Sequence, residues 1–179
     1  MKVEHSAIAG VLLLEPKVYS DARGFFLENY NKRAFREATG LEADFVQDNH
    51  SRSSKNVLRG LHYQIRQPQG KLVRVTVGEI WDVAVDLRRS SKSFGRWTAA
   101  TLSAESRRMF WVPAGFAHGF LVLSEHAEVQ YKTTDYYAPE HERTLLWNDP
   151  ALAIPWPLAG EPLLADKDRR GTPLAAADT

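Results

Sequence analysis

The chain has 179 residues, the length of one ordinary globular domain, and its hydrophobic content of 44% excludes an intrinsically disordered protein. Lysine and arginine number 23 against 22 aspartate and glutamate residues, which argues against a nucleic-acid binder but leaves room for a small anionic ligand. The absence of cysteine excludes disulfides, thiolate zinc sites and cysteine nucleophiles, and it is compatible with a cytoplasmic location.

The first apolar segment runs from Ala7 to Leu14, with Glu4 upstream and Pro16 downstream. A signal peptide requires a basic start and a small-residue cleavage site, which this segment does not show. We therefore interpret it as a β-strand. No run approaches the roughly 20 apolar residues of a membrane span.

One segment has the pattern of an α-helix. Asn31 is a suitable N-cap, and Gly40 can close the helix. Between and just beyond them, apolar residues recur at helical spacing at Phe35, Ala38 and Leu41. The sequence therefore predicts one clear helix between Asn31 and Gly40.

Most of the remaining chain predicts short β-strands. Lys71 to Val77 alternates between two faces, and a turn at Gly78 leads into a second strand from Ile80 to Leu87. Further strands are expected at Val57–Ile65, Trp97–Leu102, Met109–Val112, Gly119–Leu123 and Ala127–Thr134. Because glycine and proline separate many short strands, we predict an all-β sandwich or barrel.

The C-terminal part changes character. Residues 154–162 are rich in proline and predict a loop, and residues 163–170 predict a short helix. Residues 171–179 are predicted to fray. No repeat or linker divides the chain, so we expect a single domain over residues 1–179.

Two histidines stand in patterns that suit a binding site. His62 follows Gly60 on the same face of a predicted strand, and the glycine leaves space for a ligand. A buried histidine with satisfied hydrogen bonds is the alternative. His118 ends PAGFAH (113–118), which resembles the second signature of the cupin superfamily, a turn between two strands. An ordinary turn is the alternative here.

The first cupin signature normally begins with a His-x-His pair, followed by a glutamate, that binds a metal. The corresponding place in this chain reads His62-Tyr63-Gln64, so the second histidine and a clear glutamate ligand are missing. Three protein ligands are the usual minimum of a catalytic metal site. We therefore predict a cupin barrel with no metal and no other cofactor.

Two residues on predicted strands have both a functional and a structural interpretation. Lys71 shares a face with three valines, and an ammonium directed into a barrel is costly unless it is paired. A surface position at the start of the strand is the alternative. Tyr131 shares a face with Val129 and Thr133, and a core or rim tyrosine is the alternative for it.

Two polar stretches near the N-terminus are also ambiguous. RGFFLE (23–28) offers an arginine that can grip phosphate and aromatic rings that can stack on a base, or it forms a plain amphipathic strand. QDNH (47–50) is an ordinary loop or a source of hydrogen bonds to a ligand.

Together these pieces resemble the dTDP-4-dehydrorhamnose 3,5-epimerase family. The matching stretches are RGFFLENY (23–30), FVQDNHS (45–51), NVLRGLHYQ (56–64), QGKLVRV (69–75), VPAGFAHGF (112–120), QYKTTDYYAP (130–139), LLWNDP (145–150) and DKD (166–168). They occur in order from about Leu12 to Asp168, and LRGLHYQ with GKLVRV and PAGFAHGF is much more specific than any one motif. The resemblance implies a metal-free homodimer built on a cupin-type jelly-roll barrel with a few short helices.

The resemblance also implies a role for each matching residue. His62 corresponds to the general base, and Asp168 to the carboxylate that orients its imidazole. Tyr131 corresponds to the general acid on the opposite side of the sugar. Lys71 corresponds to the group that stabilises the enolate oxygen at carbon 4. Substrate contacts are implied for Arg23, Phe26, Glu28, Gln47, Asn49, Arg59, His118, Tyr137, Glu142 and Lys167.

Three positions depart from a simple transfer of the family pattern. Arg59 and His62 have opposite strand parity, so both can face a ligand only through a bulge or at the barrel mouth. The segment IRQPQG (65–70) differs from the better-matched parts, so the loop before Lys71 could shift slightly. Glu142 lies in a charged run, which leaves its placement open by a residue or two.

The implied residues suit proton transfer beside a ketone. Removing that proton near neutral pH needs a base such as histidine and a positive charge at the developing enolate oxygen. Inversion also needs a donor on the opposite face, and tyrosine with its ordinary pKa of ~10 stays protonated. We therefore predict an isomerase that epimerises C3 and C5 of dTDP-4-dehydro-6-deoxy-D-glucose to dTDP-4-dehydro-L-rhamnose, a step of dTDP-L-rhamnose biosynthesis.

Three other functions stay open. The first is a single-carbon epimerase that acts on a dTDP-4-keto-6-deoxyhexose for a secondary-metabolite sugar. The second is a metal-dependent cupin dioxygenase or isomerase, against which the missing His-x-His pair counts. The third is a non-catalytic sugar-binding cupin, which would not need an acid–base set such as His62, Lys71, Tyr131 and Asp168. No nucleic-acid or membrane partner is expected.

Overall fold

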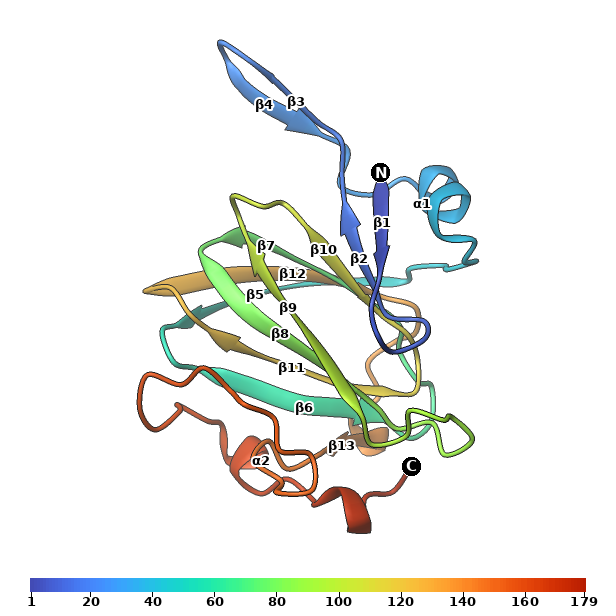
Figure 1. The fold of residues 1–179 in the computed structure, drawn as a ribbon, viewed down its shortest axis with the longest axis vertical. Helices are drawn as coiled ribbons and strands as arrows, with labels where there is room; N and C mark the ends of the chain where they lie inside the picture. The colour runs from blue at the N-terminus through green and yellow to red at the C-terminus, as the bar shows by residue number, and fades with distance from the viewer.

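The computed structural model describes all residues from Met1 to Thr179, and it confirms the predicted all-β architecture (Figure 1). A six-stranded antiparallel sheet has the order β1 (Lys2–His5), β2 (Leu12–Glu15), β10 (Met109–Val112), β7 (Lys71–Val77), β12 (His126–Thr133) and β5 (Gln47–Ser54). A five-stranded antiparallel sheet has the order β13 (Glu142–Thr144), β6 (Leu58–Gln64), β11 (Phe116–Val122), β8 (Glu79–Asp86) and β9 (Trp97–Ser103). The remaining strands, β3 (Val18–Asp21) and β4 (Gly24–Leu27), form a hairpin.

The main core lies between the two large sheets. Val73 of β7 and Val129 of β12 belong to the same buried cluster as Ile80 of β8 and Phe120 of β11. The alternation of each strand sends these apolar side chains inward, and their burial from water is the main favourable term in folding. The two sheets are therefore held as one sandwich by apolar side chains.

The predicted helix packs on part of the outer face of the six-stranded sheet, over β2 and β10. α1 spans Lys32–Thr39, and the Asn31 side chain accepts a hydrogen bond from the Ala34 amide at 3.1 Å. Gly40 ends the helix with φ of 71°, a left-handed conformation that glycine adopts easily. Phe35 is the helix's buried residue, and it packs against Trp111 of β10. Neither α-helix has the length or the apolar run needed to cross a membrane.

The outer face of the five-stranded sheet is covered by the C-terminal segment. Leu145, Trp156 and Ala177 join one buried cluster with residues of β6, β8 and β11. The Thr172 amide donates to the Thr144 carbonyl at 2.8 Å. The prediction that residues 171–179 fray is therefore wrong, because this segment packs on the sheet and bonds to its edge. The predicted helix over residues 163–170 is shorter, as α2 spans Asp166–Arg169.

Most strand predictions agree with the structure, and two do not. β7 and β10 have the predicted bounds, and β6, β8, β9 and β12 agree within one residue at each end. Only the end of the predicted strand from Ala7 to Leu14 is a strand, because residues 7–10 turn between β1 and β2, with Gly10 at φ of 94°. β11 begins at Phe116, three residues before the predicted start. The polar run at residues 47–50 opens strand β5 instead of forming a loop.

The β3–β4 hairpin projects away from the two sheets (Figure 1). Its aromatic side chains are unusually exposed: Phe25 keeps 59% and Phe26 keeps 68% of the accessible surface. Residues 24–27 of RGFFLE therefore form a strand, but neither of its faces is buried in this chain. Within this chain, however, no second sheet covers the hairpin.

Candidate active site

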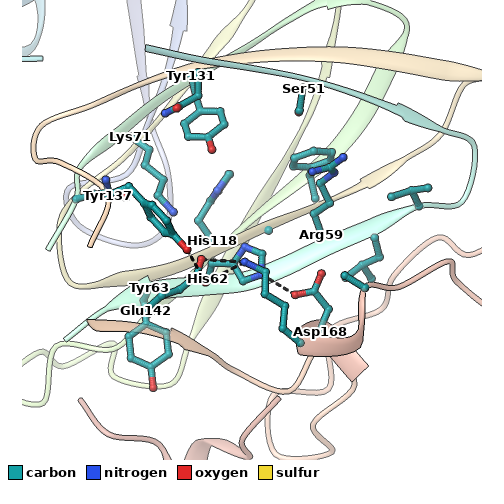
Figure 2. A pocket seen from close by; sticks show the side chains of 18 of the residues that line it. Ser51, Arg59, His62, Tyr63, Lys71, His118, Tyr131, Tyr137, Glu142 and Asp168 are labelled. Atoms are coloured by element: carbon teal, nitrogen blue, oxygen red, sulfur yellow. Dashed lines mark hydrogen bonds and ion pairs between the residues drawn. The ribbon is translucent and has the colours of Figure 1, made fainter. Parts of the chain in front are cut away.

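A cavity of about 610 Å³ opens between the two sheets. Side chains from both sheets and from the C-terminal segment line it, and Figure 2 shows several of them converging on the same space. The polar residues of the lining are Gln47, Asn49, Ser51, Arg59, His62, Tyr63, Gln64, Gln69, Lys71, His118, Tyr131, Tyr137, Glu142, Lys167 and Asp168.

His62 and Asp168 form a hydrogen-bonded pair on one side of this cavity. His62 stands on β6, and its Nε2 lies 2.6 Å from Oδ1 of Asp168, a buried residue of α2. Burial lowers the pKa of the His62 imidazole, although the bond to Asp168 works in the opposite direction. A neutral imidazole with one ring nitrogen held by a carboxylate has its other nitrogen free to accept a proton.

Tyr131 approaches from the opposite sheet. It stands on β12, between Val73 of β7 and Asn49 of β5, whereas His62 pairs with His118 of β11. Figure 2 shows the Tyr131 hydroxyl directed into the cavity. Burial raises the pKa of the Tyr131 phenol, so the hydroxyl keeps its proton at neutral pH. A base and an acid therefore enter the cavity from facing sheets.

Lys71 opens β7 and is buried, with 9% of its surface exposed, so it does not occupy the surface position. Its side chain points into the cavity beside Tyr131 (Figure 2). Burial lowers the pKa of the Lys71 ammonium to about 8, and the nearby carboxylates of Asp82 and Glu142 oppose that effect. A positive charge held in a shielded cavity suits an oxygen that becomes negative during a reaction.

A bulge in β6 brings Arg59 and His62 to the same cavity. His118 and Phe120 of β11 face His62 and Arg59, so β6 has one extra residue in this interval. Gly60 in the bulge has a φ of 114°, and a Cβ there would lie 2.7 Å from Cα of Gly119. Of the two alternatives that strand parity left open, a bulge or the barrel mouth, the structure shows the bulge, and two glycines allow the close approach of β6 and β11.

The Arg59 guanidinium is fixed by β5. Its Nε donates to Oγ of Ser53 at 2.9 Å. Gln47 and Asn49 lie on the same face of β5, where Gln47 Nε2 donates to Asn49 Oδ1 at 2.8 Å. One face of β5 therefore supplies a row of polar groups along the cavity, as the hydrogen-bonding alternative for residues 47–50 expected.

Glu142 joins two other predicted residues at the cavity. It accepts two hydrogen bonds from Nζ of Lys167, at 3.0 and 2.9 Å, and one from the Tyr137 hydroxyl at 3.2 Å. β13 places Glu142 opposite Gln64 of β6, which settles the position that the sequence left open. In this state the charge of Lys167 is matched by Glu142.

Three predicted contact residues lie outside this cavity. Arg23 and Phe26 belong to the β3–β4 hairpin, Glu28 follows it, and none of the three lines the cavity of its own chain. The Arg23 guanidinium binds Asp21 within the hairpin. These three residues therefore do not join the other predicted contact residues in the cavity of this chain, because the hairpin extends away from the sheets.

The sequence interpretation missed Asp82. This carboxylate is completely buried on β8, and its Oδ1 lies 2.6 Å from Nε2 of His118. Ile80 and Ala84, two residues away on either side, face the apolar core. A signal was available, since an acidic residue interrupts the apolar face of a predicted strand. Ser51, whose buried hydroxyl has no hydrogen-bond partner, was missed as well.

The two histidines of the cavity, which are possible metal ligands, are each bonded to one carboxylate. His62 binds Asp168 and His118 binds Asp82, and no three His, Asp or Glu side chains gather as a metal site. That the protein needs no metal stays a prediction. Metal analysis of protein purified without added metal would test it.

Comparison with known proteins gives consistent matches over nearly the whole chain. Residues 5–176 match the family model for dTDP-4-dehydrorhamnose 3,5-epimerase. A Pseudomonas aeruginosa protein of that name is 64% identical over 178 residues, which cover 99% of this chain and 98% of the relative.

Solved structures agree. The dTDP-6-deoxy-D-glucose-3,5-epimerase from Legionella pneumophila, in complex with dTDP-4-keto-L-rhamnose, superposes with a TM-score of 0.97 at 50% identity, covering 99% of this chain and 94% of that one. A 3'-monoepimerase from Streptomyces bikiniensis in complex with dTDP-quinovose gives 0.89 at 36% identity, covering 95% and 86%.

Proposed function

The chain belongs to the dTDP-4-dehydrorhamnose 3,5-epimerase family and has its cupin-type fold, and on this premise we propose how its cavity works. It is an isomerase that epimerises C3 and C5 of dTDP-4-dehydro-6-deoxy-D-glucose to dTDP-4-dehydro-L-rhamnose in dTDP-L-rhamnose biosynthesis. The observation that carries the mechanism is the entry of His62 and Tyr131 into one cavity from opposite sheets.

His62 is the general base in this proposal. Its neutral imidazole removes the proton from a carbon beside the ketone, and Asp168 stabilises the imidazolium that forms. The electron pair moves toward the carbon 4 oxygen, where the Lys71 ammonium stabilises the negative charge. The result is an enolate with a planar reacting carbon.

Tyr131 completes the inversion. Its hydroxyl donates a proton to the face of the enolate opposite His62, because the two residues come from facing sheets. The phenolate then recovers a proton from water, and the imidazolium releases one. Repetition at the second carbon beside the ketone accounts for two inversions with one catalytic set.

The nucleotide is assigned to the polar groups around this set. Arg59 binds the diphosphate, with Gln47, Asn49, His118 and Tyr137 as further contacts. Lys167 is a further candidate for a phosphate contact, because its bonds to Glu142 use two of the three N–H donors of its ammonium. Binding energy from these remote groups orients the sugar between base and acid.

The hairpin is assigned to a second copy of the chain. Arg23, Phe26 and Glu28 lie outside the cavity of their own chain, and the exposed Phe26 ring has no cover there. In a homodimer the hairpin of one copy reaches the cavity of the other, where Arg23 meets phosphate and Phe26 stacks on thymine. Most exposed apolar patches of this kind mark interaction sites.

Mixed dimers test this assignment. Arg23→Ala and His62→Asn are each expected to be nearly inactive. If the two variants are co-expressed, a mixed dimer forms in which the intact hairpin of the His62→Asn copy reaches the cavity of the Arg23→Ala copy. That cavity still has its His62. Random pairing then restores about one quarter of the sites. No recovery in verified mixed dimers would show that each hairpin serves its own chain.

The main experiment is solvent exchange in heavy water. Enzyme is incubated with dTDP-4-keto-6-deoxyglucose, and deuterium in the product is counted by mass spectrometry. Two solvent-derived deuterons support the double epimerisation. One deuteron supports a single-carbon enzyme, the activity named for the Streptomyces bikiniensis protein, and none contradicts the proposed function.

The remaining assignments of the proposal are broader. Residues 1–179 act as one domain, the enzyme uses no cofactor, and no nucleic acid or membrane takes part. A cytoplasmic location fits a chain without cysteine.

A further inference from the structure

The proposed mechanism gives no role to the buried carboxylate Asp82. Asp82 has no exposed surface, and its neighbours on the same face of β8, Ile80 and Ala84, belong to the apolar core. Its Oδ1 is bonded to His118, but its Oδ2 has no hydrogen-bond partner. A buried carboxylate is costly unless a positive charge compensates it. A buried positive charge near Asp82 is therefore expected.

His118 connects Asp82 to the cavity. Asp82 is buried and is not among the residues that line the cavity, whereas His118 is. His118 also pairs across the strands with His62, the base in the proposed mechanism. The 2.6 Å bond from Asp82 therefore fixes an imidazole that lies directly beside the catalytic one.

Lys71 supplies the opposite charge. Its ammonium is buried, and no carboxylate lies within the 4.0 Å of an ion pair. Burial is the main cause of the lowered pKa of Lys71, and Asp82 is the largest opposing influence. Glu142 also opposes it, but Lys167 and Tyr137 already bind the Glu142 carboxylate.

The other titratable groups around Lys71 cannot take over this role. They come from β6, β11, β12, β13, α2 and the loop after β12, and they are Arg59, His62, Tyr63, His118, Tyr131, Tyr137, Glu142, Lys167 and Asp168. Two of them are carboxylates. The charge of Glu142 is matched by Lys167, and Asp168 is bonded to His62. Asp82 is therefore the anion left to balance the Lys71 ammonium.

We propose that Asp82 is a positioning residue, which holds His118 in the cavity wall and supplies the buried negative charge that balances the Lys71 ammonium where the enolate forms. The proposal rests on the proposed function, because it assigns Lys71 to the carbon 4 oxygen. It separates the two histidine–carboxylate pairs by task. Asp168 stabilises the base His62, and Asp82 balances the Lys71 ammonium that faces the negative enolate oxygen.

The test is the pH profile of Asp82→Asn. Asparagine keeps an oxygen for His118 but removes the negative charge. Loss of one nearby charge lowers the pKa of Lys71, so the alkaline limb of kcat/KM for deuterium exchange moves to lower pH by about one unit. Glu79→Gln removes an acidic residue from the same strand outside the cavity and leaves the limb in place. An equal loss of rate at every pH in Asp82→Asn overturns the proposal.

A second measurement applies if Asp82→Asn folds poorly. Thermal unfolding is compared for Lys71→Met, Asp82→Asn and the double variant. If the two charges balance one another, the double variant unfolds at a higher temperature than Asp82→Asn alone. Additive losses contradict the pairing. Wild-type enzyme that exchanges no deuterium contradicts the proposed function itself, whereas normal exchange with an unmoved limb contradicts only the role of Asp82.

Discussion

The cavity between the sheets and the β3–β4 hairpin both carry residues expected to contact the substrate, but the fold places them very differently. His62 and Asp168 are 106 residues apart and lie 2.6 Å from each other. Arg23 and Phe26 are close in sequence to the first core strand, and yet they project into solvent (Figure 1). Residues on strands of two packed sheets are brought together by folding of the chain itself, whereas residues on a free hairpin need another surface.

This difference predicts two kinds of defect. Changes in the cavity should affect the proton-transfer steps, because the groups there touch the reacting carbons. Changes on the hairpin should affect binding of the nucleotide and depend on the second copy.

The largest effect is expected for His62→Asn. Without the base, deuterium exchange should fall by about 10³-fold, within the range for loss of general base catalysis. His50→Asn is the matched control, because His50 pairs with Glu128 outside the cavity. Exchange is measured by mass spectrometry under single-turnover conditions. Substantial exchange in His62→Asn would mean that another group removes the proton.

Tyr131→Phe should produce a smaller and more selective loss. The ring stays in place but the proton donor is gone, so formation of the inverted sugar should fall by about 10²-fold. Exchange should fall less, because His62 still removes and returns protons on its own face. The control is Tyr136→Phe, a change to an exposed tyrosine outside the cavity. Equal losses of inversion and exchange would contradict this division of labour.

The pH dependence follows from the two groups whose charge matters. His62 must be neutral, and burial lowers its pKa below 6.5, so the rate rises as the pH increases through that lowered value. Lys71 must be protonated, so the rate falls as the pH increases through about 8. We expect a bell-shaped kcat/KM with about a tenfold loss per pH unit beyond each limb. A rate that stays constant to pH 10 would exclude a role for the Lys71 charge.

The sequence was sufficient to predict the local features of this site. Alternation placed Lys71 on the inner face of β7 and helix caps placed α1, because both signals span only a few residues. The facing of His62 and Tyr131 depends on which strands share a sheet, and alternation within a strand carries no such information. For the same reason the resemblance named Arg23 and Phe26 as contacts but could not tell which chain's cavity they reach. Asp82 was missed because an apolar strand pattern tolerates one acidic residue.

The smallest effects should come from the two adjacent phenylalanines of the hairpin, which allow a close comparison. Phe26→Ala should raise KM about tenfold with little change in kcat, because a stacked base contributes binding without touching the reacting carbons. Phe25 points to the other face of β4, where the Arg107 guanidinium lies 4.1 Å from its ring centre. An exposed contact of this type is worth about 0.5–1 kcal/mol, so Phe25→Ala should raise KM less than about fivefold. Steady-state kinetics at matched dimer concentrations measures both. Equal effects of the two changes would mean that the hairpin only holds the two copies together, and that Phe26 does not contact the nucleotide.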